Sequence, residues 1–152
     1  MEKYKAVDVA NWMLNKQSMS PKKLQKMVYY AYAWTLTLLN ESSDKLNNRL
    51  FDEPIEAWVH GPVVPSLYHK YSQYGYDNID KVDHCIKFPE DVEDVLNQVL
   101  DVYGSYNANQ LESITHQESP WINARQGLLP LEGGNRPIKD KDIFDYYIQQ
   151  SA

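Results

Sequence analysis

The sequence predicts a mainly α-helical fold, a single compact domain of six or seven helices with a small β element near residues 55–60. Apolar residues recur at helical spacing along most of the chain, and proline or glycine separates these segments. The one stretch rich in β-forming residues is short. A length of 152 residues with 43% hydrophobic content fits one domain spanning residues 1–152.

Two helices are expected in the first forty residues. Residues 5–16 form a short amphipathic helix. Residues 21–39 form the clearest helix of the chain, and Ser20-Pro21 supplies an N-cap followed by proline at the first helical position. Because its apolar and aromatic residues cover so much of its circumference, we expect it to be the central helix, buried on several sides. Its apolar stripe comprises Leu24, Met27, Val28, Ala31, Thr35 and Leu38.

The start of this second helix is basic. Lys22, Lys23 and Lys26 lie in its first turns, where the helix dipole disfavours each cation by about 0.3–1 kcal/mol. Either these side chains bind an anion or an acidic partner, or they are solvated charges that only aid solubility. Lys23, Lys26 and Tyr30 share one face of the helix, as a contact surface requires.

The most distinctive stretch follows a polar connection and spans residues 51–68. Ile55 to Val59 is rich in β-formers and is expected to be a short strand. Gly61-Pro62 predicts a rigid turn after His60, because glycine accepts a positive φ and proline fixes its own. Pro65 then fits the first turn of another helix.

The second half of the chain continues as helices separated by loops. Residues 77–88 leave a loop and a short strand equally open, and a loop containing Gly133-Gly134 is expected at residues 128–137. The expected helices are residues 89–103 ended by Gly104, one capped by Asn107, one capped by Ser119-Pro120, and residues 139–149.

Charge and cysteine content narrow the classes of function. The net charge of −6 argues against nucleic acid as a partner. Residues 1–50 carry a net +4 and residues 51–152 a net −10, a polarity that suits either a charged protein partner or a solvated surface. Cys85 is the only cysteine, so no internal disulfide forms. With no apolar run approaching the roughly 18 residues of a membrane span, a cytoplasmic protein is expected.

The histidines give little support for catalysis. None of the four has metal-ligand spacing, and neither a metal nor another cofactor is expected. The alternative function is a hydrolase or transferase that uses His60, His116 and Glu118 for proton transfer. No activated nucleophile is recognisable, so a non-enzymatic role is favoured, in which His116 bonds a nearby carbonyl and Trp121 fills the core.

Four sequence blocks, read together, resemble a known family. They are SPKKLQKMVYYA at residues 20–31, FDEPIEAWVHGPVVP at residues 51–65, LESITHQESPW at residues 111–121 and IFDYY at residues 143–147. Their order is similar to that of the SocA-like antitoxin domain, also called Panacea, found in phage-associated proteins of the GepA type. The second block is the most specific.

The resemblance implies an antitoxin of a prophage-associated toxin–antitoxin module that binds its toxin directly. It also implies a second route, delivery of the toxin to the ClpXP protease by the antitoxin acting as an adaptor. The side chains expected to contact a partner are Lys23, Lys26, Tyr30, Trp58, His60, Gly61, Pro62, Tyr68, His116, Glu118 and Trp121.

Overall fold

The computed structural model describes residues 3–151, and seven α-helices and one two-stranded hairpin make up the regular structure of this part. This confirms the mainly α-helical fold and the small β element. The elements are α1 (Ala6–Lys16), α2 (Pro21–Leu38), β1 (Glu56–Trp58), β2 (Gly61–Val63), α3 (Pro65–Tyr71), the 3-10 turn η1 (Ser72–Tyr74), α4 (Glu90–Tyr103), α5 (Ala108–Thr115), α6 (Ser119–Ala124) and α7 (Asp140–Gln150).

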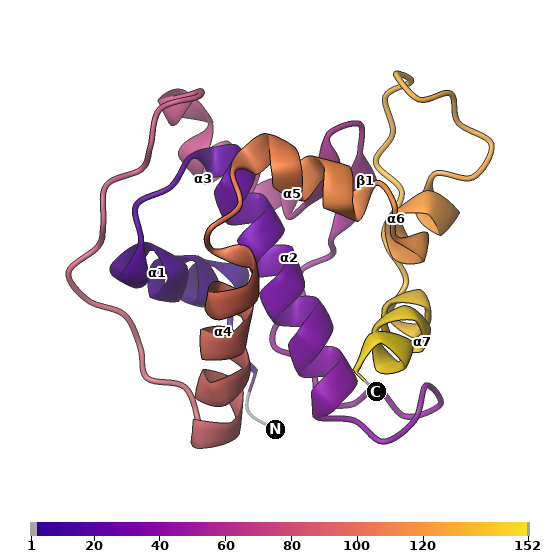
Figure 1. Cartoon of the computed structure of the whole chain (residues 1–152), viewed down its shortest axis with the longest axis horizontal. Helices are drawn as coiled ribbons and strands as arrows, with labels where there is room; N and C mark the ends of the chain where they lie inside the picture. Colours follow the sequence, from indigo (N-terminus) through magenta and orange to yellow (C-terminus); the bar gives the residue numbers. More distant parts are fainter. Residues whose placement is uncertain (1–2, 152) are drawn as a thin grey trace.

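Helix α2 is the central helix, as the sequence predicts. It runs through the middle of the molecule, with α1 and α4 on one side and α7 on the other (Figure 1). It also contacts α3, α5 and β2. Every residue from Leu24 to Ala33 is buried, whereas Leu38, the last residue of the predicted stripe, is 44% exposed at the end of the helix.

The helix ends follow the predicted capping residues with one exception. Ser20 Oγ accepts a hydrogen bond from the Lys23 backbone N–H, and Asn107 forms a capping box with Gln110. The N-cap of α6 is Glu118, so the prediction that Ser119 caps this helix is wrong. Glu118 has the extended backbone of a cap, but its side chain turns to core hydroxyl groups instead of the helix end.

The β element is larger than the single strand that the sequence predicts. Strand β1 pairs with β2 in antiparallel register, with Glu56 opposite Val63 and Trp58 opposite Gly61. The tight turn between the strands comprises Val59 and His60, so it comes just before the corner predicted after His60, and Gly61 begins β2 with φ = +113°. The other edge of β1 bonds the segment before α7, because Ala57 N–H donates to Arg136 O over 2.9 Å, and Ile138 N–H donates to Ile55 O, just before β1, over 2.8 Å. The hairpin thus contacts the segment that leads into α7, the C-terminal helix.

Residues 77–88, left open by the sequence, contain no strand in the described structure. They form a loop that hydrogen bonds attach to the rest of the chain at a few points. Ile79 N–H donates to Met19 O over 2.8 Å, and the Asn15 side-chain amide donates to Val82 O over 3.0 Å. The loop therefore stays close to α1 and the connection that follows it.

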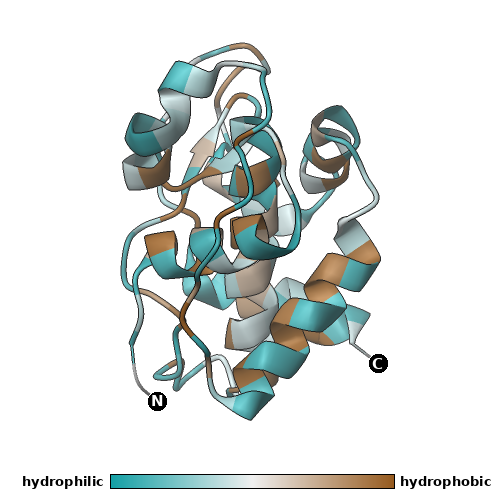
Figure 2. Ribbon diagram, turned by 90° about the vertical axis from the view of Figure 1, so that its left-hand side faces the viewer, coloured by the Kyte–Doolittle hydropathy of each residue, from teal (hydrophilic) through white to brown (hydrophobic). Residues whose placement is uncertain are grey.

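Polar and apolar residues alternate along the helices instead of forming long apolar runs (Figure 2). Unlike the buried middle of α2, such helices pack by one apolar face and leave the other to solvent. Within residues 3–151, no helix is both long and apolar enough to cross a membrane.

Candidate protein-binding groove

A groove with a volume of about 650 Å³ lies where the hairpin meets the start of α2. Four of the predicted contact residues line it, namely Lys26, Trp58, His60 and Tyr68. We call this surface the hairpin groove. The residues that complete its lining are Pro21, Lys22, Gln25, Val59, Val63, Ser72, Gly75, Tyr76, Gly133 and Gly134.

Aromatic side chains form one wall of the hairpin groove. The Trp58 and Tyr68 rings meet edge to face, with 5.0 Å between their centroids. Tyr68 is 47% exposed and Tyr76 is 97% exposed, so both rings are available to a partner. The backbone brings Trp58 and Tyr68 together, because Trp58 is the last residue of β1 and Tyr68 lies on α3, which follows the rigid segment 61–65.

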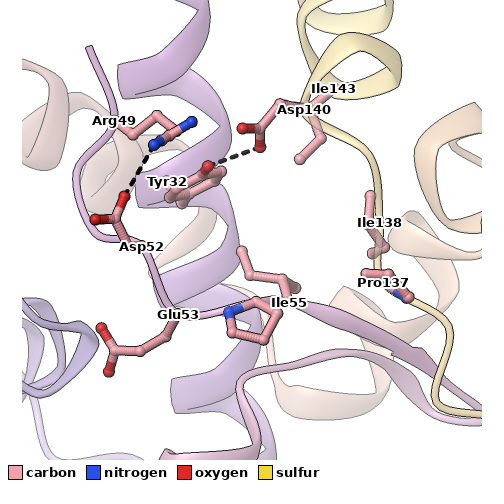
Figure 3. A pocket seen from close by; sticks show the side chains of 10 residues that line it. Tyr32, Arg49, Asp52, Glu53, Ile55, Pro137, Ile138, Asp140 and Ile143 are labelled. Atoms are coloured by element: carbon pink, nitrogen blue, oxygen red, sulfur yellow. Dashed lines mark hydrogen bonds and ion pairs between the residues drawn. The ribbon is translucent and has the colours of Figure 1, made fainter. Parts of the chain in front are cut away.

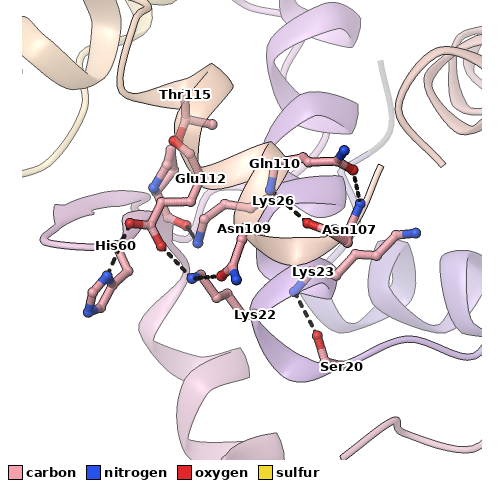
Figure 4. Close-up of polar contacts among 11 residues, drawn as sticks. Ser20, Lys22, Lys23, Lys26, His60, Asn107, Asn109, Gln110, Glu112 and Thr115 are labelled. Carbon is pink, nitrogen blue, oxygen red and sulfur yellow. Dashed lines mark hydrogen bonds and ion pairs between the residues drawn. The ribbon is translucent and has the colours of Figure 1, made fainter. Parts of the chain in front are cut away.

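Contacts of the lysines explain why the start of α2 tolerates its positive charge. The Lys22 ammonium pairs with the Glu112 carboxylate and donates to Asn109 Oδ1 over 2.9 Å, both on α5 (Figure 4). The Lys23 ammonium donates to Gly104 O over 2.6 Å, at the C-terminal end of α4. A helix C-terminus carries partial negative charge, so Lys23 interacts favourably with α4 although its position on α2 is unfavourable.

Lys26 lies deeper than the other two lysines. Its side chain is 1% exposed, and its ammonium donates to Pro62 O on β2 over 3.3 Å. Burial lowers the pKa of Lys26 to about 7, an effect that the charge of Lys22 strengthens and that of Glu112 opposes. Lys26 is thus almost fully covered, and it is part of the lining of the hairpin groove.

Gly61 and Pro62, both predicted contact residues, are buried and hold the hairpin against Lys26. A Cβ atom on Gly61 would lie 2.5 Å from Lys26 Cε and 3.1 Å from Thr115 Oγ1. Glycine at this position permits both the positive φ and the close approach of β2 to α2.

The substitution Gly61→Ala should lower the free energy of unfolding by about 2 kcal/mol, because it adds backbone strain and overpacks the Lys26 side chain. For a chain of this size, that corresponds to a melting temperature lower by about 4–8 °C, measured by circular dichroism. Gly133→Ala is the control, since a Cβ there meets no atom within 4 Å. Equal melting temperatures for Gly61→Ala and the wild type would contradict the expectation.

His116 and Trp121 lie behind the hairpin, where they support the aromatic wall. Their rings stack with centroids 3.9 Å apart, and Trp121 Nε1–H donates to Trp58 O over 2.9 Å. Arg125, on the same side, donates to Ala57 O over 3.0 Å. Burial lowers the pKa of His116, which favours the neutral ring at pH 7. These contacts fix the β1 backbone and hence the position of Trp58.

Glu118 and Tyr30, two further predicted contact residues, belong to a buried polar network. Glu118 Oε1 accepts hydrogen bonds from the hydroxyls of Tyr30 and Tyr147, each over 2.8 Å. Tyr30 is fully buried and Glu118 is 8% exposed. Burial raises the pKa of Glu118, although the two hydroxyl donors act in the opposite direction. The network joins α2, α6 and α7 from inside the molecule.

The arrangement does not assemble the proton-transfer site of the alternative hypothesis. Across residues 3–151, neither His60 nor His116 bonds Glu118. His60 Nδ1 lies 3.2 Å from Glu112 Oε2 instead, and its side chain is 71% exposed. The described residues also include no group of three or more histidine, cysteine or acidic side chains placed to hold a metal ion.

A second hollow of about 340 Å³ lies between α2, the 49–55 segment and the start of α7 (Figure 3). Its polar groups pair with one another, since Tyr32 donates to Asp140 over 2.7 Å and Arg49 to Asp52 over 3.1 Å. None of the predicted contact residues lines this hollow.

The structure therefore divides the predicted contact residues into two groups. One group lines the hairpin groove, and the other supports it from behind, belongs to the core or, for Lys23, bonds the end of α4. The supporting residues are Lys23, Tyr30, Gly61, Pro62, His116, Glu118 and Trp121. Sequence reasoning missed Gln25, whose side chain bonds both backbone groups of Val64, and the glycines of the 128–137 loop. Only their position in space, beside the other groove residues, identifies them.

Comparison with known proteins agrees with the sequence motifs. The family model described as "Antitoxin SocA-like, Panacea domain" matches residues 24–122, a range that holds most of α2, the hairpin and α5. Antitoxin SocA of Caulobacter vibrioides (strain NA1000 / CB15N) is 30% identical over 157 residues, covering 91% of this chain and 80% of its own length. No solved structure matches the chain. The chain thus belongs to the SocA-like, Panacea-domain family of antitoxins, and its role is of the antitoxin type.

Proposed function

We propose that this chain is a cytoplasmic antitoxin that neutralises a toxin protein by direct contact, and that the hairpin groove is the contact surface. Family membership supports the antitoxin role. The observation that carries the choice of surface is the hairpin groove itself, which joins one tryptophan, two tyrosines and two lysines in one concave site.

The aromatic wall has the properties of an interface anchor. Tyrosine and tryptophan dominate the binding energy of many protein interfaces, because they bury a large area with few rotatable bonds. Trp58 is partly buried and Tyr68 is half exposed, so an incoming apolar side chain would cover both rings. The loss of apolar surface to water then favours association.

The supporting contacts hold this wall in place before binding. The Trp58 indole donates to Glu56 Oε1 over 2.8 Å, and its backbone carbonyl accepts from Trp121. A side chain that is already ordered loses less entropy when a partner binds. The groove is therefore suited to tight binding without rearrangement of the hairpin.

The first test is co-purification of the chain with the product of the adjacent gene, beside growth assays in which the neighbour is expressed alone or with the chain. A toxic neighbour that forms a stable complex and is neutralised by co-expression supports the proposal. A neighbour that is neither toxic nor bound would contradict it for this gene pair.

The contact surface is tested by Tyr68→Ala, which should weaken toxin binding at least tenfold without changing the melting temperature by more than about 2 °C. Tyr68 lies outside the core, and its ring contacts within the chain are with Trp58 and His69, so its loss costs the fold little compared with what the partner loses. The matched control is Tyr106→Ala, which removes a 37%-exposed tyrosine outside the groove. Equal toxin affinity for both variants, measured by calorimetry, would exclude the hairpin groove as the contact surface.

The same growth assay, repeated in cells with and without ClpXP, distinguishes blocking of the toxin from its delivery to this protease. If the chain blocks its toxin, co-expression rescues growth with or without ClpXP. If the chain is an adaptor, rescue is lost in cells without ClpXP although the complex still forms. Either route requires the toxin to bind this chain, so the hairpin groove is the proposed contact surface in both.

A further inference from the structure

Among residues 3–151, no acidic side chain lines the hairpin groove, although the chain carries a net charge of −6. Its charged residues are Lys22 and Lys26, and His60 completes the polar end. The rest of the lining is mostly apolar or aromatic. The groove therefore combines an apolar slot with one positively charged end.

Lys26 has unused hydrogen-bonding capacity at that end. A lysine ammonium carries three N–H donors, and the side chain of Lys26 donates to one acceptor, Pro62 O, among the described residues. It is buried to 1% exposure, so bulk water does not supply the missing acceptors. A buried ammonium with one weak acceptor is costly unless a further partner completes its shell.

The neighbouring carboxylate does not serve Lys26. Glu112 pairs with Lys22 and lies 3.2 Å from His60 Nδ1, so two other groups share it (Figure 4). Although partial burial alone raises the pKa of Glu112, the hydrogen bonds from Lys22 and His60 hold it below its ordinary value. Glu112 is thus ionised at neutral pH and already occupied. Lys22 and His60 thus share one carboxylate, and a second carboxylate would serve Lys26.

The geometry points to a specific occupant, an extended segment of the toxin in which an aspartate or glutamate lies beside a large apolar residue. The carboxylate reaches the Lys26 end of the groove, and the apolar side chain packs on Trp58 and Tyr68. This inference rests on the proposed function, since it names the part of the partner that the hairpin groove recognises. Charge complementarity and the apolar lining together favour this segment over a basic or purely apolar one.

Such binding should depend on pH. In the free protein the pKa of Lys26 is about 7, and the titratable groups around it are Lys22, Glu112, His60 and His116. A carboxylate beside Lys26 favours the ammonium form and raises this pKa, so binding takes up a proton near neutral pH. The affinity should then fall as the pH rises from about 7 to about 8.5, where the free amine is mostly neutral.

A random heptapeptide library displayed on phage tests the proposal without knowledge of the toxin. The full chain is immobilised, and peptides are selected at about pH 6.5 in parallel with a Lys26→Met variant. We expect the wild type to enrich peptides in which Asp or Glu neighbours Phe, Trp, Leu or Tyr, and the variant to lose the acidic preference. One selected peptide is then compared with its Glu→Gln or Asp→Asn form by fluorescence anisotropy.

We expect the amide form to bind the wild type at least tenfold more weakly and the variant with less than a twofold change. The amide peptide needs no altered protein, so this comparison holds even if Lys26→Met folds poorly. Apolar peptides without acidic enrichment, or amide and acid forms of equal affinity, would overturn the carboxylate assignment. Selection of no peptides at all would overturn it too. A toxin complex in the co-purification would still stand in each case, so the failure of this inference is separable from failure of the proposed function.

Discussion

Glu118→Ala is expected to lower the free energy of unfolding by about 4 kcal/mol, twice the loss expected for Gly61→Ala. The carboxylate accepts hydrogen bonds from two buried tyrosine hydroxyls, and bonds to a charged group contribute about 1.5–3 kcal/mol each. Alanine removes both bonds and leaves a space between three helices. Tyr147 keeps a bond to the Tyr29 hydroxyl over 3.0 Å, whereas Tyr30 loses its acceptor entirely.

Glu118→Gln separates hydrogen bonding from charge. Glutamine offers the same carbonyl oxygen to Tyr30 and Tyr147 without a charge to desolvate, so we expect a loss of at most about 1 kcal/mol at pH 7. Glu41→Ala, which removes an exposed acid from a loop, controls for the change in net charge. Urea unfolding at pH 7 measures the free energy of unfolding of all three variants. If Glu118→Ala and Glu118→Gln lose equal stability, the network does not act through its acceptor.

Lys26→Met is expected to change how stability depends on pH. The pKa of Lys26 is about 7 in the folded protein and about 10.5 in the unfolded chain, so between these values the unfolded chain binds more protons. The stability of the wild type therefore rises with pH across this window, by up to about 1.4 kcal/mol per pH unit from this one group. Methionine has no proton to lose, so the variant lacks this contribution.

The measurement is urea unfolding of the wild type and Lys26→Met at pH 7, 8 and 9, with the difference in unfolding free energy taken at each pH. We expect the wild type to gain stability relative to Lys26→Met as the pH rises. Of the three pH values, pH 7 should be the most favourable to the methionine variant, because the buried ammonium destabilises the wild type most there. Lys81→Met, at an exposed position, is the control. Parallel pH curves for the wild type and Lys26→Met would show that Lys26 is not perturbed by burial.

The helices are predictable because their signals are local. Ser20-Pro21, Asn107 and Gly104 act on backbone groups within a few residues of themselves, and the structure uses all three at helix ends. The long apolar stripe of α2 also predicts a central helix, since such a surface is stable only when other elements cover it. Ser119 is the first residue of α6 instead of its cap, and the side chain of the actual N-cap residue, Glu118, bonds the distant Tyr30 and Tyr147 hydroxyls.

The candidate site is predictable in part. Trp58, His60 and Tyr68 belong to a stretch whose prolines and glycine fix the backbone, so their proximity follows from local geometry. Lys26 stands out in the sequence because its charge conflicts with the helix dipole at the start of α2. The resolution of that conflict, burial beneath β2, depends on residues 35 or more positions away and leaves no local signal.

The sequence by itself determined the family, the mainly helical fold, the ends of most helices and the rigid corner at Gly61. These follow from capping, periodicity and backbone restriction, which act over a few residues. Only the tertiary structure decided which predicted residues line the hairpin groove and which are buried behind it. Burial and hydrogen bonding across distant segments settle that division, because Lys26 meets Pro62, and Glu118 meets Tyr30 and Tyr147, only after the helices pack around α2.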